Sequence, residues 1–160
     1  MPSVARTDPT LVTRMRLRTL GHDEHWLQDQ LAADPTILGV GDVRLVTQEL
    51  HQTSGGFLDL LYERDDTYFS VEVQLGGLDA SHAFRALEYW TRNRTRWPDR
   101  DHVAVIVADQ INTRYGTALR SLADDLPLIV IELSAGRDGS GDTTLATKVV
   151  AAHPDLGLTV

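Results

Sequence analysis

The residues from 67 to 75 alternate between apolar and polar side chains, and this pattern constrains the fold more than any other feature of the chain. A period of two residues is typical of a β-strand with one buried face. The two faces consist of Phe69, Val71, Val73 and Leu75 on one side, and of Ser70, Glu72 and Gln74 on the other. The pattern therefore places a carboxylate and an amide together on one face of a predicted strand.

A second acidic residue, Asp59, lies within the apolar run from 57 to 62, which also predicts a strand. A charged carboxylate between two leucines is costly to bury without a cation or several hydrogen-bond donors. A short turn at 64–66 joins the two strands, so Asp59 can reach Glu72 and Gln74 if the register allows it. The spacing predicts a divalent-metal site on adjacent strands. The alternative is that Glu72 is an outward strand residue and Asp59 a residue beside a turn.

Magnesium suits such a site because it prefers oxygen ligands and keeps several of its waters. Asp59, Glu72, the backbone carbonyl of Val73 and water form a sufficient ligand set, and Glu24 could serve a second ion. In phosphodiester hydrolysis such ions generate hydroxide and neutralise charge in the transition state. Gln74 can only orient water or a phosphate oxygen by hydrogen bonds, whereas a lysine there would add positive charge.

The rest of the pattern predicts an α/β domain. Helices are predicted at 22–33, 79–97 and 112–124, and strands at 43–50, 57–63, 67–75, 102–108, 127–133 and 143–150. Short connections make the first three strands an antiparallel meander, and the strands that flank the third helix should be parallel. We therefore expect a mixed sheet flanked by helices in a single domain at 22–160, preceded by a flexible or loosely helical lead-in at 1–21.

The second predicted helix has a basic and aromatic face opposite an apolar one. At about 100° per residue, the basic face holds His82, Arg85, Tyr89, Arg92 and Arg96, and the apolar face holds Ala83, Leu87 and Trp90. Such a helix can pack on a sheet and present guanidinium groups to a nucleic-acid backbone. His82 is a candidate to contact the scissile phosphate or to position water. The alternative is a solvated face with ion pairs from Arg85 or Arg92 to Glu88.

Composition narrows the function classes. The chain of 160 residues is 42% apolar, enough for one self-sufficient core, and its lack of cysteine excludes disulfides, thiolate metal sites and cysteine nucleophiles. A net charge of -8 opposes nucleic-acid binding by the molecule as a whole, but five arginines between positions 85 and 100 form a local positive patch. The sequence has no signal-peptide core or membrane-spanning stretch, so we expect a cytoplasmic protein that does not bind membranes.

These features together resemble the PD-(D/E)XK nuclease superfamily, whose core is a helix, a three-stranded meander, a helix and a strand. The resemblance rests on Glu24, on segment 56–61 with Asp59, and on segment 71–76 with Glu72 and Gln74. Segments 79–90, 93–98 and 102–108 are similar to a bacterial and phage subfamily of small members. The resemblance covers roughly residues 22 to 134.

The resemblance implies a restriction-endonuclease-like core and magnesium-dependent cleavage of DNA, with manganese as a substitute and RNA as an alternative substrate. Asp59 and Glu72 would bind the metal, Glu24 would assist, and Gln74 stands where the superfamily usually has a lysine. It also implies a role in restriction, phage defence or DNA processing. Small size favours a homodimer or a subunit of a larger complex. A nuclease-fold module that binds nucleic acid without cutting it is the alternative.

Overall fold

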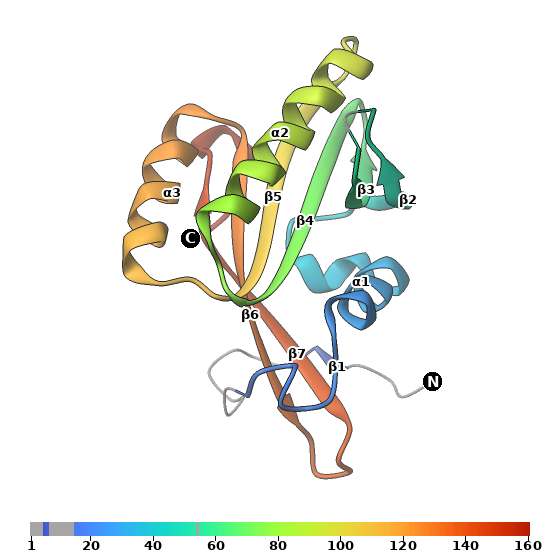
Figure 1. Ribbon diagram of the computed structural model, residues 1–160, viewed down its shortest axis with the longest axis vertical. Helices are drawn as coiled ribbons and strands as arrows, with labels where there is room; N and C mark the ends of the chain where they lie inside the picture. Colours follow the sequence, from blue (N-terminus) through green and yellow to red (C-terminus); the bar gives the residue numbers. More distant parts are fainter. Residues whose placement is uncertain (1–4, 7–14, 54) are drawn as a thin grey trace.

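The computed structural model describes residues 5–6, 15–53 and 55–160, which form a mixed sheet with helices on both faces (Figure 1). The seven strands lie in the order β1-β7-β6-β5-β4-β3-β2. Their bounds are β1 (Ala5–Arg6), β2 (Arg44–His51), β3 (Phe57–Arg64), β4 (Thr67–Gly77), β5 (Asp101–Gln110), β6 (Leu128–Arg137) and β7 (Thr143–Ala152). The helices are α1 (Glu24–Ala33), α2 (Ala80–Arg96) and α3 (Thr113–Asp125), with short 3-10 helices at Pro35–Leu38 and Pro154–Leu156.

The strand directions follow from the lengths of the connections. Strands β2, β3 and β4 pair antiparallel through short turns, whereas β4, β5 and β6 are parallel and joined through α2 and α3. Strand β7 returns antiparallel to β6. The predicted α/β fold, with an antiparallel meander and a mixed sheet flanked by helices, is therefore confirmed.

The two faces of the sheet have separate cores. Odd-numbered residues of β4, such as Val71 and Val73, pack with Leu27 and Leu31 of α1. On the other face, α2 and α3 pack against β5 and β6, and Trp90 of α2 donates its indole N–H to the backbone oxygen of His102 at 3.0 Å. Glu72 and Gln74, at even positions of β4, consequently face α2. Among the described residues no helix is long and apolar enough to cross a membrane.

The segment before α1 differs from the expected lead-in where the structure describes it. Ala5–Arg6 pairs in parallel with β7, and Met15 bridges to Ala135 of β6. Residues 17–21 form turns, and Leu17 is fully buried in the core on the α1 side of the sheet. Residues 15–21 therefore belong to the packed domain, because an apolar side chain anchors them. Positions 1–4 and 7–14 lie outside the described residues.

Candidate active site

Strands β3 and β4 separate at the level of Val71, and the candidate site lies where they part. Beyond this point the Val73 N–H donates to Asp59 Oδ2 at 2.8 Å, and the Leu75 N–H donates to Glu24 Oε1 at 3.2 Å. Two carboxylates thus take up backbone donors that a continuous β3 would otherwise satisfy. The geometry of both acids is set by the main chain of the sheet.

Asp59 is held on three sides. Besides the bond from Val73, its Oδ1 accepts a hydrogen bond from Gln28 Nε2 at 3.0 Å, and its own N–H donates to Glu72 Oε1 at 3.3 Å. Burial raises the pKa of Asp59 to about 6, although the N–H of Val73 and the charge of Arg85 act in the opposite direction. The carboxyl group therefore ionises with difficulty unless more positive charge is supplied.

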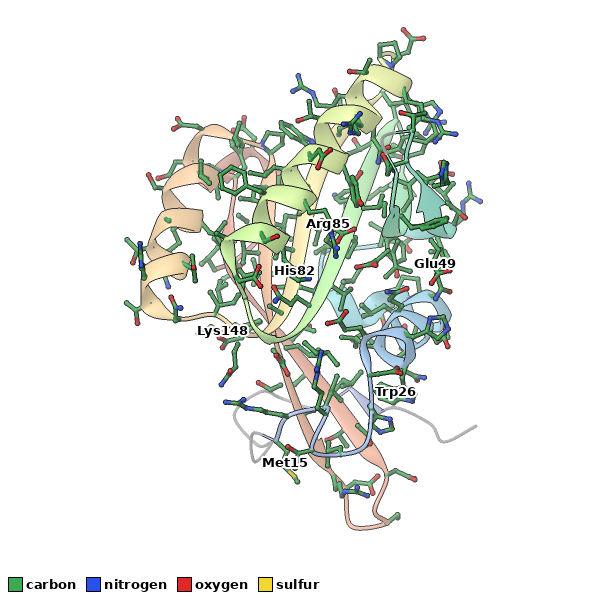
Figure 2. The ribbon with its side chains drawn as sticks, viewed as in Figure 1. Met15, Trp26, Glu49, His82, Arg85 and Lys148 are labelled. Carbon is green, nitrogen blue, oxygen red and sulfur yellow. The ribbon has the colours of Figure 1, made fainter. Side chains whose placement is uncertain are left out.

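Glu72 is paired with Arg85 of α2, which points toward the central strands (Figure 2). The Arg85 Nε and Nη2 atoms lie 3.1 and 2.9 Å from Glu72 Oε2. Burial and the neighbouring Asp59 raise the pKa of Glu72 to about 7, while Arg85 lowers it. When both acids are ionised, two negative charges and one positive charge leave a net charge of -1, so the site can attract a further cation.

Helix α1 contributes two polar residues from one face. Glu24 accepts from Leu75 and also lies 3.4 Å from Arg18 Nη2. Gln28, one turn later, is buried and orients Asp59, while its Oε1 has no hydrogen-bond partner among the described residues. The sequence pattern does not single out Gln28, although its position four residues after Glu24 is a signal that the two share a face.

Gln74 and His82 both contact Asp79, the residue that caps α2. The Gln74 amide donates to Asp79 Oδ2 at 3.3 Å and accepts from the Asp79 N–H at 3.3 Å. Asp79 Oδ1 accepts from the His82 N–H at 2.8 Å and lies 3.0 Å from His82 Nδ1. These contacts secure the start of α2. In the described part of the chain, no hydrogen bond joins Gln74 or His82 to Asp59 or Glu72, so their predicted roles with water or phosphate stay predictions.

The predicted basic face of α2 divides into an inner and an outer part. Arg85 lies in the site against Glu72, whereas Arg92 Nε and Nη2 contact Glu88 Oε1 at 3.1 and 2.9 Å. The ion pair with Glu88 that was the alternative for Arg92 is therefore present. The Arg96 guanidinium lies 4.5 Å from the centre of the Trp97 ring, at the surface.

Tyr89 is not the open nucleic-acid contact that the helix projection predicts. Its side chain is only 5% exposed, and its hydroxyl lies where a side chain at Gly56 would begin. Gly56 has a φ of +85°, which also favours glycine. Tyr89 therefore joins α2 to the start of β3, beside the strand that carries Asp59.

Changing Gly56 to alanine is expected to lower the free energy of unfolding by about 2 kcal/mol, because it combines an unfavourable φ with displacement of Tyr89. Urea unfolding measures this loss. Gly55→Ala is a matched control, since Gly55 has a φ of +91° but nothing within 4 Å of the new methyl group. Equal losses in the two variants would show that Tyr89 does not pack against Gly56.

The donor set fits magnesium by its chemistry, although no group of three or more His, Asp or Glu side chains is arranged for a metal within the described ranges. Magnesium needs only one or two carboxylates, because waters complete its octahedron. Half-buried Asp59 and buried Glu72 offer carboxylate oxygens to such an ion, and burial raises the pKa of both groups. The negative charge of Glu24 also raises the pKa of Asp59, so Glu24 lies within electrostatic range.

Two solved structures resemble this fold. One is a complex of EndoMS with double-stranded DNA, with a TM-score of 0.54 and 13% identity over 66% of this chain and 43% of that chain. The other is a repair endonuclease from Pyrococcus abyssi, with a TM-score of 0.53 and 12% identity over 62% of this chain and 43% of that chain. The fold is nuclease-like.

The likeness to these two endonucleases concerns the fold alone, because so few residues are identical. The chain spans 43% of the length of each. No family model and no curated protein matches the sequence. Any chemistry at this site therefore has to come from the residues that form it.

Proposed function

We propose that this protein is a metal-dependent endonuclease that hydrolyses phosphodiester bonds in DNA. The observation that carries the proposal is the pair of half-buried Asp59 and buried Glu72, joined by a hydrogen bond from the Asp59 backbone N–H and left with one net negative charge by Arg85. The pair lies in a fold shared with two DNA endonucleases, which supports the same class of reaction. Restriction, phage defence or DNA processing, and assembly as a homodimer or in a larger complex, belong to the same proposal.

Asp59, Glu72 and the Val73 carbonyl would hold a magnesium or manganese ion. The N–H and C=O of one extended residue point to the same side of a strand, so the Val73 carbonyl faces the side on which its N–H meets Asp59. When bound, such an ion activates water and offsets charge on the phosphate. Glu24 is the candidate to assist from α1.

The remaining residues of the site orient these groups. Gln28 holds one oxygen of Asp59, which leaves the carboxylate a single orientation. The Arg85 side chain is 41% exposed, so a guanidinium that touches Glu72 also has a side open to a phosphate oxygen. Gln74 fixes the N-terminus of α2 through Asp79 and thereby fixes the helix that carries Arg85.

Plasmid cleavage tests the proposal. We expect the purified protein to nick or linearise DNA with magnesium or manganese and to stop when a chelator is added. The two carboxylates need more positive charge than Arg85 provides, and the ion would supply it. Added manganese should also raise the melting temperature in a concentration-dependent way, independently of catalysis. Cleavage that persists unchanged in chelator would contradict metal dependence.

A second candidate is a nuclease-fold module that binds DNA without cutting it. The observation that favours it is the ion pair between Glu72 and Arg85, which already occupies one carboxylate. This module would bind DNA equally well with and without chelator, show no rise in melting temperature with manganese, and leave plasmids intact. The same titrations therefore separate the two candidates.

A further inference from the structure

A groove of about 810 Å³ lies between the end of β2 and the exposed side of α2. His51 and Thr53 line one wall, and Arg92 and Arg96 line the other. Helix α2 leads from this groove to the carboxylate pair, because Arg85 of the same helix contacts Glu72. From Arg85 to Arg96 the helix advances by about 16 Å, a length that several nucleotides can cover.

An exposed phenylalanine stands beside the groove. Phe57 is 55% exposed, and its ring meets the ring of His51 edge-on, with centroids 5.3 Å apart. Phe57 precedes Asp59 by two residues on β3, a separation of about 7 Å along the strand. An open aromatic ring at this distance from the carboxylate pair is suited to stacking a base.

The charges of the groove favour single-stranded DNA, which has a lower charge density than a duplex. Arg92 is paired with Glu88, whereas Arg96 has no carboxylate partner among the described residues and donates only to the His51 backbone oxygen, at 3.5 Å. Duplex DNA carries one charge per about 1.7 Å of its axis, and a single strand carries about half that density. A protein with a net charge of -8 therefore repels a duplex more strongly. Stacking contributes about 1–3 kcal/mol per unpaired base.

We propose that this groove binds a single DNA strand, with a base on Phe57 and the flanking phosphates on Arg96 and Arg92, and directs the strand to Asp59 and Glu72. The inference rests on the proposed nuclease function and deepens it by naming an unpaired strand as the substrate. Base stacking and phosphate contacts require no metal. Binding can therefore be measured separately from cleavage.

Fluorescence anisotropy with a labelled oligothymidine, in chelator, tests the groove. We expect the single strand to bind at least about tenfold more tightly than an oligoadenine–oligothymidine duplex of the same length. Phe57→Ala should weaken single-strand binding about tenfold, and Phe57→Trp should retain it, because both aromatic rings stack. Arg96→Ala should weaken binding and lower the slope of log K against log salt by about 0.7.

Two controls match these variants. Phe84, on the first turns of α2, is 73% exposed but does not line the groove, so Phe84→Ala should bind as the wild type does. Arg114→Ala, at the start of α3, is the control for Arg96. Tighter binding of the duplex, or equal losses in Phe57→Ala and Phe84→Ala, would overturn the assignment.

The two proposals fail in different ways. If the protein binds the single strand through Phe57 and Arg96 but never cuts it, the groove proposal stands and the nuclease proposal fails. If cleavage depends on metal but is insensitive to Phe57→Ala and Arg96→Ala, the nuclease proposal stands and the groove proposal fails. Melting temperatures of all variants establish that they are folded, which is expected because Phe57 and Arg96 lie at the surface.

Discussion

Replacing Asp59 by asparagine is expected to lower metal-dependent plasmid cleavage about 100-fold or more, because the amide would remove one of the two proposed anionic metal ligands. The fold should tolerate the change. Both oxygens of Asp59 accept hydrogen bonds, one from Val73 and one from Gln28, so an asparagine amide nitrogen would meet a donor. Gln28 can rotate its amide and offer its oxygen, which has no partner among the described residues.

Initial rates of supercoiled-plasmid loss, at equal protein and saturating magnesium, measure the effect. Glu72→Gln should show a comparable loss. Asp124→Asn is the matched control, because Asp124 is exposed on α3, and Figure 1 shows α3 and β2 on opposite sides of α2. Wild-type rates in Asp59→Asn would remove Asp59 from the active site, and a loss in Asp124→Asn would show that the assay reports general damage.

Changing Arg85 to glutamine is expected to lower the free energy of unfolding by about 2 kcal/mol at pH 8. Removing one member of a buried ion pair costs about 3–5 kcal/mol, and the partial exposure of Arg85 reduces the effect. The loss arises because buried Glu72 and half-buried Asp59 would then be two neighbouring acids without a nearby cation. Arg92→Gln, which breaks an exposed pair on the same helix, should cost at most about 0.5 kcal/mol.

The pH dependence identifies the cause. Burial raises the pKa of both acids, so the folded protein retains their protons longer than the unfolded chain does. Their unfavourable contribution to the free energy of unfolding is absent below about pH 4 and grows as pH rises through about 6 and 7. Arg85 lowers the pKa of Glu72, so loss of Arg85 should reduce the free energy of unfolding further at pH 8 and change it little at pH 5.

Urea unfolding at both pH values measures this difference. In a Glu72→Gln background, Arg85→Gln should cost much less at pH 8, since the carboxylate is already gone. An equal cost at pH 5 and pH 8 would mean that Arg85 acts through packing rather than charge.

Most of the fold follows from local patterns in the sequence. The alternation from 67 to 75 and the short turns at 54–56 and 64–66 are enough to predict the meander, and the helical patterns between the later strands predict their parallel pairing. Segment 15–21 was harder to place, because its arginines at 16 and 18 obscure Leu17, which the α1 side of the core buries. A short irregular segment has no period that reveals such an anchor.

The site could be predicted only in part. Asp59 and Glu72 meet as expected, since strand pairing is periodic and register follows from a short turn. The contact of Gln28 with Asp59 crosses 31 positions and two elements, and depends on how α1 packs. The helical projection predicts an open Tyr89 because it gives the direction of a side chain and not what covers it, here the chain at Gly56.

The parting of β3 from β4 has a consequence for how easily mutation can disturb this centre. The N–H groups of Val73 and Leu75 that anchor the two acids are identical for every amino acid except proline. Exchanging the side chain at either position alters the neighbouring core and still leaves the anchor in place. The placement of Asp59 and Glu24 therefore depends on backbone groups, and substitutions of the surrounding side chains can leave it unchanged.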